Sequence, residues 1–139
     1  MASRESLDNA YMQVALAHGE LSKGKRAKVG ACIVTQHGVI LGGCNGLAPG
    51  GSNELEVDDT TKPEVIHAEL SCILKAAREG VSVVNSTLYV TLSCCLPCSE
   101  MIAAAGIARV VYRDHYRCTK GIGNLESHGI IVEQIGETL

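Results

Sequence analysis

Apolar residues along this chain recur first at helical spacing and then in short continuous runs that are typical of strands. Over residues 7–20 they follow the three-and-four spacing of one helix face, and Ser3 or Ser6 is placed to cap the helix start. The face expected to be buried consists of Leu7, Ala10, Tyr11, Val14, Ala17 and His18. The chain is therefore predicted to begin with an amphipathic helix.

Two apolar runs follow, Val29–Thr35 and Val39–Asn45, and the segment Gln36–Gly38 between them predicts a hairpin turn. Nearly every residue of both runs is apolar, which is typical of a sheet that is covered on both faces. We therefore expect helices on each side of the sheet.

The rest of the chain alternates between helix and strand patterns, and a glycine follows each expected helix where a left-handed C-cap belongs. The expected helices cover residues 64–80, 95–105 and 120–128, and the expected strands cover residues 87–91, 108–112 and 130–135. In the first of these helices the expected buried stripe is Ile66, Leu70, Ile73, Leu74 and Ala77. Strands joined through helices require crossover connections, so these strands are predicted to be parallel.

The element order predicts an α/β fold, a three-layer α-β-α sandwich in one domain over residues 1–139. Its five-stranded mixed sheet is expected to be antiparallel only at the first hairpin and parallel in the remaining strands. The segment of residues 46–63 is expected to be a long loop, and long loops in compact domains are usually functional.

Composition narrows the function classes. Apolar residues make up 46% of the chain and charged residues 19%, which is typical of a globular domain. The net charge of −3 argues against nucleic acid as the main partner, because phosphate backbones require basic surfaces. One basic segment, residues 23–28, is either a solvated loop or a site for a single phosphate group.

The seven cysteines are an odd number, and the N-terminal residues do not have the pattern of a signal peptide. Reduced thiols in a cytoplasmic protein are therefore expected, rather than a disulfide framework. No apolar run approaches the ~18 residues that span a bilayer, so no membrane partner is expected.

Four residues carry the candidate chemistry. Cys95 and Cys98 have the C-x-x-C spacing at a predicted helix start, and His67 and Glu69 lie near the start of another helix. Helix starts that follow strands of an open α/β sheet meet at one edge, where sites form. One imidazole and two thiolates fit a catalytic zinc ion with an open fourth position.

Glu69 is expected to act beside the metal rather than to bind it. Two residues from His67, its carboxylate can take the proton of a reacting water and deliver it to a leaving nitrogen. This role requires a carboxylate that is held near the nucleophile and away from bulk water.

Other interpretations remain open for these residues. Cys95 and Cys98 are also compatible with a structural zinc site or a redox pair, although a redox pair has no need of His67 and Glu69. Cys94 is not expected to be a ligand, because adjacent side chains rarely converge on one ion. The remaining cysteines that lie in apolar runs are interpreted as small core residues, namely Cys32, Cys44 and Cys72.

The segment His67-Ala68-Glu69 together with Cys95-x-x-Cys98 resembles the zinc-dependent nucleobase deaminases, whose signature is H-x-E with P-C-x-x-C. Cys94 replaces the usual proline. Over nearly the whole chain the resemblance is to deoxycytidylate (dCMP) deaminases of phage and bacterial type, and Cys44–Gly51 is similar to their Tyr-Asn-Gly-x-Pro loop. The resemblance implies a cytidine-deaminase-like fold.

The resemblance also implies substrate contacts. Asn45 would hydrogen-bond the deoxyribose, and the backbone beside Ala68 would read the pyrimidine carbonyl. Tyr116 would cover the ring. Arg26 would bind the 5′-phosphate, which gives the basic segment a role.

The activity implied is hydrolytic deamination of dCMP, with 5-substituted dCMP as a further possible substrate, to dUMP and ammonia. The resemblance further implies one Zn²⁺ per chain, a homo-oligomer that we expect to be a hexamer, and regulation by dCTP and dTTP, with Mg²⁺ as a companion of such an effector. The alternatives are a tRNA adenosine deaminase or a free nucleoside or base deaminase of the same fold, and a non-catalytic zinc-binding module with a closed site.

Overall fold

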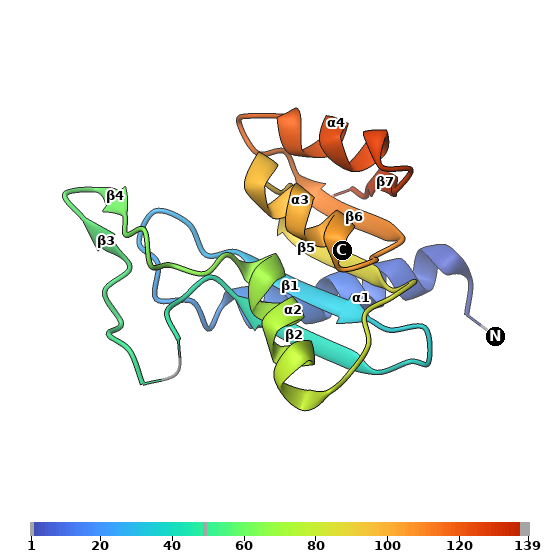
Figure 1. Ribbon diagram of the computed structural model, residues 1–139, viewed down its shortest axis with the longest axis horizontal. Helices are drawn as coiled ribbons and strands as arrows, with labels where there is room; N and C mark the ends of the chain where they lie inside the picture. Colours follow the sequence, from blue (N-terminus) through green and yellow to red (C-terminus); the bar gives the residue numbers. More distant parts are fainter. Residues whose placement is uncertain (1, 49, 137–139) are drawn as a thin grey trace.

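The apolar runs form one sheet in the computed structural model, which describes residues 2–48 and 50–136 (Figure 1). Over these residues the sheet has five strands, and it is the mixed sheet that the sequence predicts. From one edge to the other the strands are β2 (Ile40–Cys44), β1 (Gly30–Val34), β5 (Thr87–Leu92), β6 (Arg109–Asp114) and β7 (Ile131–Gln134).

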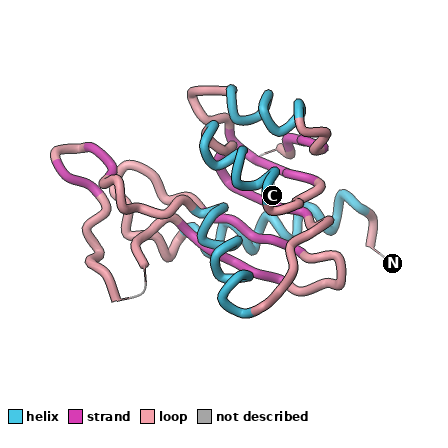
Figure 2. The backbone as a smooth tube through the Cα atoms, in the orientation of Figure 1, coloured by secondary structure: helices cyan, strands magenta, loops and turns pink. Residues whose placement is uncertain are grey.

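Helices cover both faces of this sheet, which confirms the three-layer prediction (Figures 1 and 2). The helix α1 (Arg4–Gly19) lies on one face, where Met12 and Ala15 pack against Cys32, Tyr89 and Val111. The opposite face is covered by α2 (Ala68–Glu79), α3 (Leu96–Ala104) and α4 (Lys120–Ser127). Alternate strand residues point to the two helical layers, as the period of a strand requires.

The strand directions differ from the prediction at one pairing. β1 is antiparallel to β2, as the hairpin requires, but it is also antiparallel to β5. β5, β6 and β7 are mutually parallel, as expected. The prediction that only the hairpin strands pair antiparallel is wrong because β1 lies between β2 and β5, so the connection through α2 passes over β1.

The buried face of α1 is rotated by about one residue from the predicted face. The buried residues are Asp8, Met12, Ala15 and Gly19, whereas Leu7 is 40% exposed. The spacing was correct and the face was wrong, because Asp8 enters the interior to meet a partner distant in sequence. Ser3 is the N-cap, and its hydroxyl accepts a hydrogen bond from the Ser6 amide.

The stripe predicted for α2 is also displaced. Ala68, Glu69, Cys72 and Ala76 are buried, whereas Leu74 is 47% exposed. α2 begins at Ala68 rather than Glu64, and its first turn carries a buried carboxylate that a hydrophobic pattern does not reveal. Gly80 ends the helix with a φ of 68°, which confirms the expected left-handed C-cap.

The expected long loop contains a small hairpin. Its strands are β3 (Glu56–Val57) and β4 (Thr60–Thr61), which form a separate two-stranded sheet that extends from the body of the molecule (Figure 1). Leu55 anchors the start of this hairpin and is only 3% exposed. Within residues 2–48 and 50–136, the helices are all too short or too polar to span a bilayer.

Candidate active site

His67 and Cys95 occupy equivalent positions, each as the N-cap of a helix. His67 precedes α2, and Cys95 joins β5 to α3. A two-residue bridge pairs Gly46, just beyond β2, with Ile66, through N–H···O distances of 3.0 and 2.7 Å. This bridge closes the long loop and sets His67 beside the end of β5.

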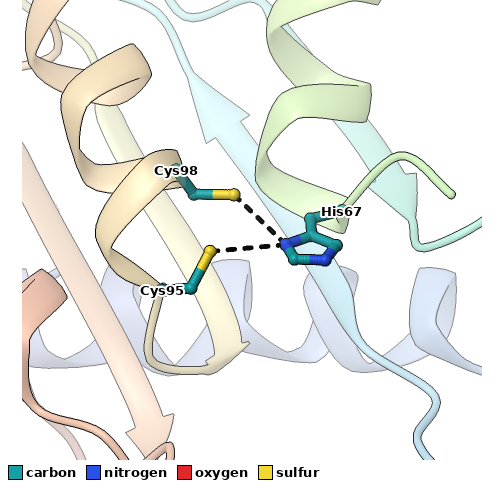
Figure 3. A group of neighbouring side chains, drawn as sticks. All are labelled: His67, Cys95 and Cys98. Carbon is teal, nitrogen blue, oxygen red and sulfur yellow. Dashed lines mark hydrogen bonds between the residues drawn. The ribbon is translucent and has the colours of Figure 1, made fainter. Parts of the chain in front are cut away.

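The three predicted ligands converge. The Nδ1 atom of His67 lies 3.2 Å from Cys98 Sγ and 3.5 Å from Cys95 Sγ (Figure 3). All three ligand atoms lie within 4.8 Å of one another, and they form the one such group of three or more found in the described part of the chain. Residues separated by about thirty positions in sequence therefore share one site.

Hydrogen bonds among the three side chains shift their pKa values. Hydrogen bonds from Cys98 and His67 lower the pKa of Cys95 to about 4. The hydrogen bond with Cys95, together with burial, raises the pKa of Cys98, and the hydrogen bond to Cys95 raises the pKa of His67. The cluster thus holds a thiolate that is stabilised by its neighbours, as is typical of a thiol prepared for metal binding.

The donor set fits zinc. A tetrahedral zinc ion with bonds of about 2.0–2.3 Å holds a nitrogen and a sulfur ligand about 3.5 Å apart, close to the two distances observed here. The adjacent Cys94 is not part of this group of ligand atoms, and burial raises its pKa to about 12. Three protein ligands leave one position of a tetrahedral ion open, as in catalytic rather than structural zinc sites.

Glu69 lies in the first turn of α2 with only 4% of its surface exposed. Burial raises the pKa of Glu69 to about 7, so its carboxyl can both lose and gain a proton near neutral pH. The side chain lines the same cavity as His67 and Cys95. This is the position that the acid–base role requires.

Two of the three cysteines that were predicted to be core residues, Cys32 and Cys72, belong to the hydrophobic core. Cys32 and Cys72 are fully buried, and burial raises their pKa values to about 11 and about 12. The prediction is wrong for Cys44, which is only half-buried because it ends the edge strand β2; its partial burial still raises its pKa. These thiols are protonated and lie outside the metal group.

A cavity of about 470 Å³ adjoins the metal group, and all four predicted substrate residues line it. Arg26 comes from the basic segment, Asn45 from the end of β2, Ala68 from α2 and Tyr116 from the segment after β6. Their individual roles remain predictions. The resemblance at residues 44–51 also includes Pro49, which lies outside the described residues.

The Asn45 side chain makes two hydrogen bonds, to the backbone of the basic segment and to that of the residue before β1. Its Oδ1 accepts a hydrogen bond from the Val29 amide at 2.9 Å, and its Nδ2 donates to the Ala27 carbonyl at 3.1 Å. One amide hydrogen and one lone pair remain for a ligand. Asn45 therefore fixes the end of the basic segment at the cavity wall.

Several cavity residues were missed by sequence reasoning. Arg117 and His115 line the wall next to Tyr116, and Arg117 also lies over the Tyr116 ring, 5.7 Å from its centroid. Glu56 and Thr60 of the β3–β4 hairpin close another side. Nothing in the local sequence pattern marks these residues, because they reach the site only through tertiary folding.

An α-β-α sandwich that presents His-x-Glu and C-x-x-C at two helix starts defines the class of zinc-dependent nucleobase deaminases. Residues 5–114 match the family described as "Cytidine and deoxycytidylate deaminase zinc-binding region". The chain belongs to this family.

Named relatives and solved structures agree with this placement. A solved dCMP deaminase from the cyanophage S-TIM5, in complex with dCMP and dUMP, superimposes with a TM-score of 0.91 at 40% identity, over 96% of this chain and all of that one. The deoxycytidylate deaminase of Mycobacterium phage D29 is 36% identical over 126 residues. ComE operon protein 2 of Bacillus subtilis (strain 168) is 37% identical over 116 residues.

The relatives differ in length. The alignments cover 79% of this chain in both cases, but 96% of the Mycobacterium phage protein and 61% of the Bacillus protein. The chain is therefore similar in extent to the Mycobacterium phage D29 and cyanophage S-TIM5 proteins and spans about three fifths of the Bacillus protein.

Proposed function

We propose that this protein deaminates dCMP hydrolytically to dUMP and ammonia. The observation that carries the proposal is one cavity lined by zinc ligands, by a buried carboxylate and by the two arginines Arg26 and Arg117. Guanidinium groups are well suited to bind a phosphate. The similarity to phage proteins named as deaminases of this nucleotide supports the choice of substrate.

His67, Cys95 and Cys98 would hold Zn²⁺, which supplies a coordinated water with a pKa lowered to about 7. Two thiolates and a neutral imidazole would supply the three protein ligands of the ion. Cys95, as the N-cap of α3, also benefits from the partial positive charge of the helix start.

Glu69 would move the protons. Its carboxylate takes the two protons of the reacting water in turn and delivers one to ring N3 and the other to the amino group that leaves as ammonia. The burial that raises the pKa of Glu69 to about 7 makes both transfers accessible at neutral pH. Burial also keeps competing water away from the carboxylate.

The other cavity residues would orient the nucleotide. The backbone next to Ala68 faces the pyrimidine, the spare amide hydrogen of Asn45 meets the deoxyribose, and Tyr116 covers the ring. Arg26 binds the 5′-phosphate. Arg117, next to Tyr116 in the same wall, is placed to assist Arg26.

The rival functions make different demands on the site. A nucleoside or free-base deaminase has no use for two arginines in the cavity, and an RNA deaminase calls for a more basic surface than a chain of net charge −3 offers. A closed structural zinc site needs a fourth ligand, and Cys94 is not among the ligand atoms that group together in the portion of the chain that the structure describes. Each of these observations favours the nucleotide deaminase.

The test is a panel of cytidine, deoxycytidine, dCMP and dCTP, assayed side by side with the zinc-loaded protein. We expect dCMP to be deaminated with the highest kcat/KM. Equal values for dCMP and deoxycytidine would contradict the proposal. The same panel with 5-methyl and 5-hydroxymethyl dCMP, and with added dCTP or dTTP, tests the wider substrate range and the regulation.

The proposal also covers the oligomeric state, the cellular location and the effectors of the protein. We infer a cytoplasmic homo-oligomer, with a hexamer as the expected size, and dCTP or dTTP as effectors. Mg²⁺ enters only as a companion of such an effector. Light scattering with and without each nucleotide measures the assembly directly.

A further inference from the structure

The basic segment that carries Arg26 has little regular structure, yet it is tied down along its length. Ser22 donates its hydroxyl to the Asn45 carbonyl at 3.1 Å and accepts the Gly24 amide at 3.1 Å. Asn45 holds Ala27 and Val29 as described above. These contacts fix the two ends of the segment and leave its middle, Lys25 and Arg26, to another partner.

That partner is Glu56 of the β3–β4 hairpin, thirty residues away in sequence. Its Oε1 accepts the Lys25 amide at 2.7 Å and the Arg26 amide at 3.2 Å. These two backbone hydrogen bonds lower the pKa of Glu56, so the carboxylate is ionised at neutral pH. Hydrogen bonds to an ionised acceptor are stronger than neutral ones.

The Arg26 side chain is left available for a ligand. Its guanidinium makes no hydrogen bond or ion pair with the described residues, while Arg26 lines the cavity together with Glu56. An otherwise flexible side chain thus extends from a backbone that is held from two sides. Such a backbone is the condition for a well-placed phosphate ligand, because small errors of position weaken binding sharply.

We propose that Glu56 is a positioning residue for recognition of the 5′-phosphate: its carboxylate holds the backbone of Lys25 and Arg26 so that the Arg26 guanidinium meets the phosphate of the substrate. The inference rests on the proposed function. It assigns a role in phosphate recognition to a residue whose own negative charge prevents it from binding the phosphate directly. The β3–β4 hairpin thereby becomes part of the nucleotide specificity of the site.

Because Glu56 is negatively charged, the direction in which its removal changes KM for dCMP distinguishes the two explanations. If Glu56 acted only as a nearby negative charge, its removal would favour the anionic dCMP and lower KM. If it positions Arg26, Glu56→Ala raises KM for dCMP by about tenfold with kcat changed less than about twofold. Glu56→Gln keeps the Oε1 atom that accepts both amides and restores KM to within about threefold of the wild type.

Two further readouts separate positioning from general loss of structure. The kcat/KM for deoxycytidine, which lacks the phosphate, stays within about twofold in Glu56→Ala and reports the fraction of folded enzyme. Binding of dUMP, measured by calorimetry on the zinc-loaded protein, weakens by the same factor as KM. Glu54→Ala is the matched control. Glu54 is exposed and lies two residues before Glu56, so this substitution removes the same charge from the same segment.

A double-mutant cycle locates the effect. In the Arg26→Ala background, Glu56→Ala is expected to add less than about twofold to KM, because the residue acts through Arg26. Parallel losses on dCMP and deoxycytidine, an unchanged or lower KM for dCMP in Glu56→Ala, or full additivity with Arg26→Ala would each overturn the proposal. Failure of the proposed function shows separately and earlier, as equal use of dCMP and deoxycytidine by the unmodified protein.

Discussion

Arg109 and Asp8 form a buried bidentate ion pair between residues that are 101 positions apart in the chain. The two guanidinium nitrogens donate to the two carboxylate oxygens at 2.8 and 2.6 Å, and each side chain is 8% exposed. Tyr89 also donates to Asp8 at 2.7 Å, and Arg109 Nε donates to Glu133 at 2.6 Å. This network joins α1 to three neighbouring strands behind the active site.

Asp8→Ala is expected to destabilise the protein by about 3 kcal/mol, because removal of one partner leaves the other charge buried. The value lies at the lower end of the range for such changes because Glu133 still neutralises part of the Arg109 charge. Urea denaturation measures the difference. Glu5→Ala on the exposed side of α1 is the control, with an expected change below about 0.5 kcal/mol, and a similarly small effect for Asp8→Ala would refute this account.

The same pair predicts how stability depends on pH. Burial raises the pKa of Asp8, but hydrogen bonds from Arg109 and Tyr89 outweigh burial and leave the pKa below the ordinary value of 3.8. A lowered folded pKa contributes stability that is complete above the unfolded pKa and is lost as the pH falls through the folded pKa. The difference in unfolding free energy between the wild type and Asp8→Asn should therefore be constant from pH 7 to about 5 and shrink below about pH 4. A difference that grows on acidification would contradict the assignment.

The α1 helix shows what the sequence can and cannot predict. Its existence and start follow from local spacing and from the Ser3 cap, which are properties of neighbouring residues. Its buried face was misplaced because Asp8 is polar, and the energetic reason for burying it lies in Arg109. Local patterns carry no information on a partner 101 residues away.

In the active site, too, the features set by local sequence were predictable and those set by tertiary folding were not. His67, Glu69, Cys95 and Cys98 were predictable because each lies at a helix start with a recognisable spacing and chemistry. The cavity wall was not predictable in the same way, because Glu56 and Arg117 reach it from segments with no periodic pattern. The antiparallel pairing of β1 with β5 was missed for a related reason, since strand order depends on which crossover passes over which strand.

The zinc content of single variants should distinguish the three predicted ligands from the adjacent Cys94. Cys98→Ala and His67→Ala are expected to lower bound zinc from about one ion per chain to nearly none, because two remaining ligands hold zinc weakly. Cys94→Ala should retain full zinc, since Cys94 is not part of the group of ligand atoms formed by His67, Cys95 and Cys98. Metal analysis of the purified proteins gives the comparison. Loss of zinc in Cys94→Ala without loss of folding would favour a closed four-ligand site instead.

Arg26→Ala should raise KM for dCMP by about tenfold or more and leave kcat/KM for deoxycytidine within about twofold, because only the phosphate contact is removed. Lys28→Ala is the matched control: it removes a positive charge from the same exposed segment but does not line the cavity. Steady-state kinetics on both substrates provides the readout. Equal effects of the two variants would show that general charge attraction, rather than a specific contact, governs nucleotide binding.

Glu69→Gln is expected to lower kcat by about 10²–10⁴-fold while zinc content and dUMP affinity stay close to those of the wild type. The amide has the shape of the buried carboxyl, so the cavity is preserved, but it neither accepts the proton of the reacting water nor delivers one to the leaving amine. Glu79→Gln at the exposed end of the same helix makes the same chemical change outside the cavity and should leave kcat unaltered. A Glu69→Gln protein that binds zinc and turns over dCMP at the wild-type rate would require another residue to transfer the protons. Among the described residues that line the cavity, Glu56 is the other carboxylate, and it is less buried than Glu69 and accepts hydrogen bonds from the backbone of Lys25 and Arg26.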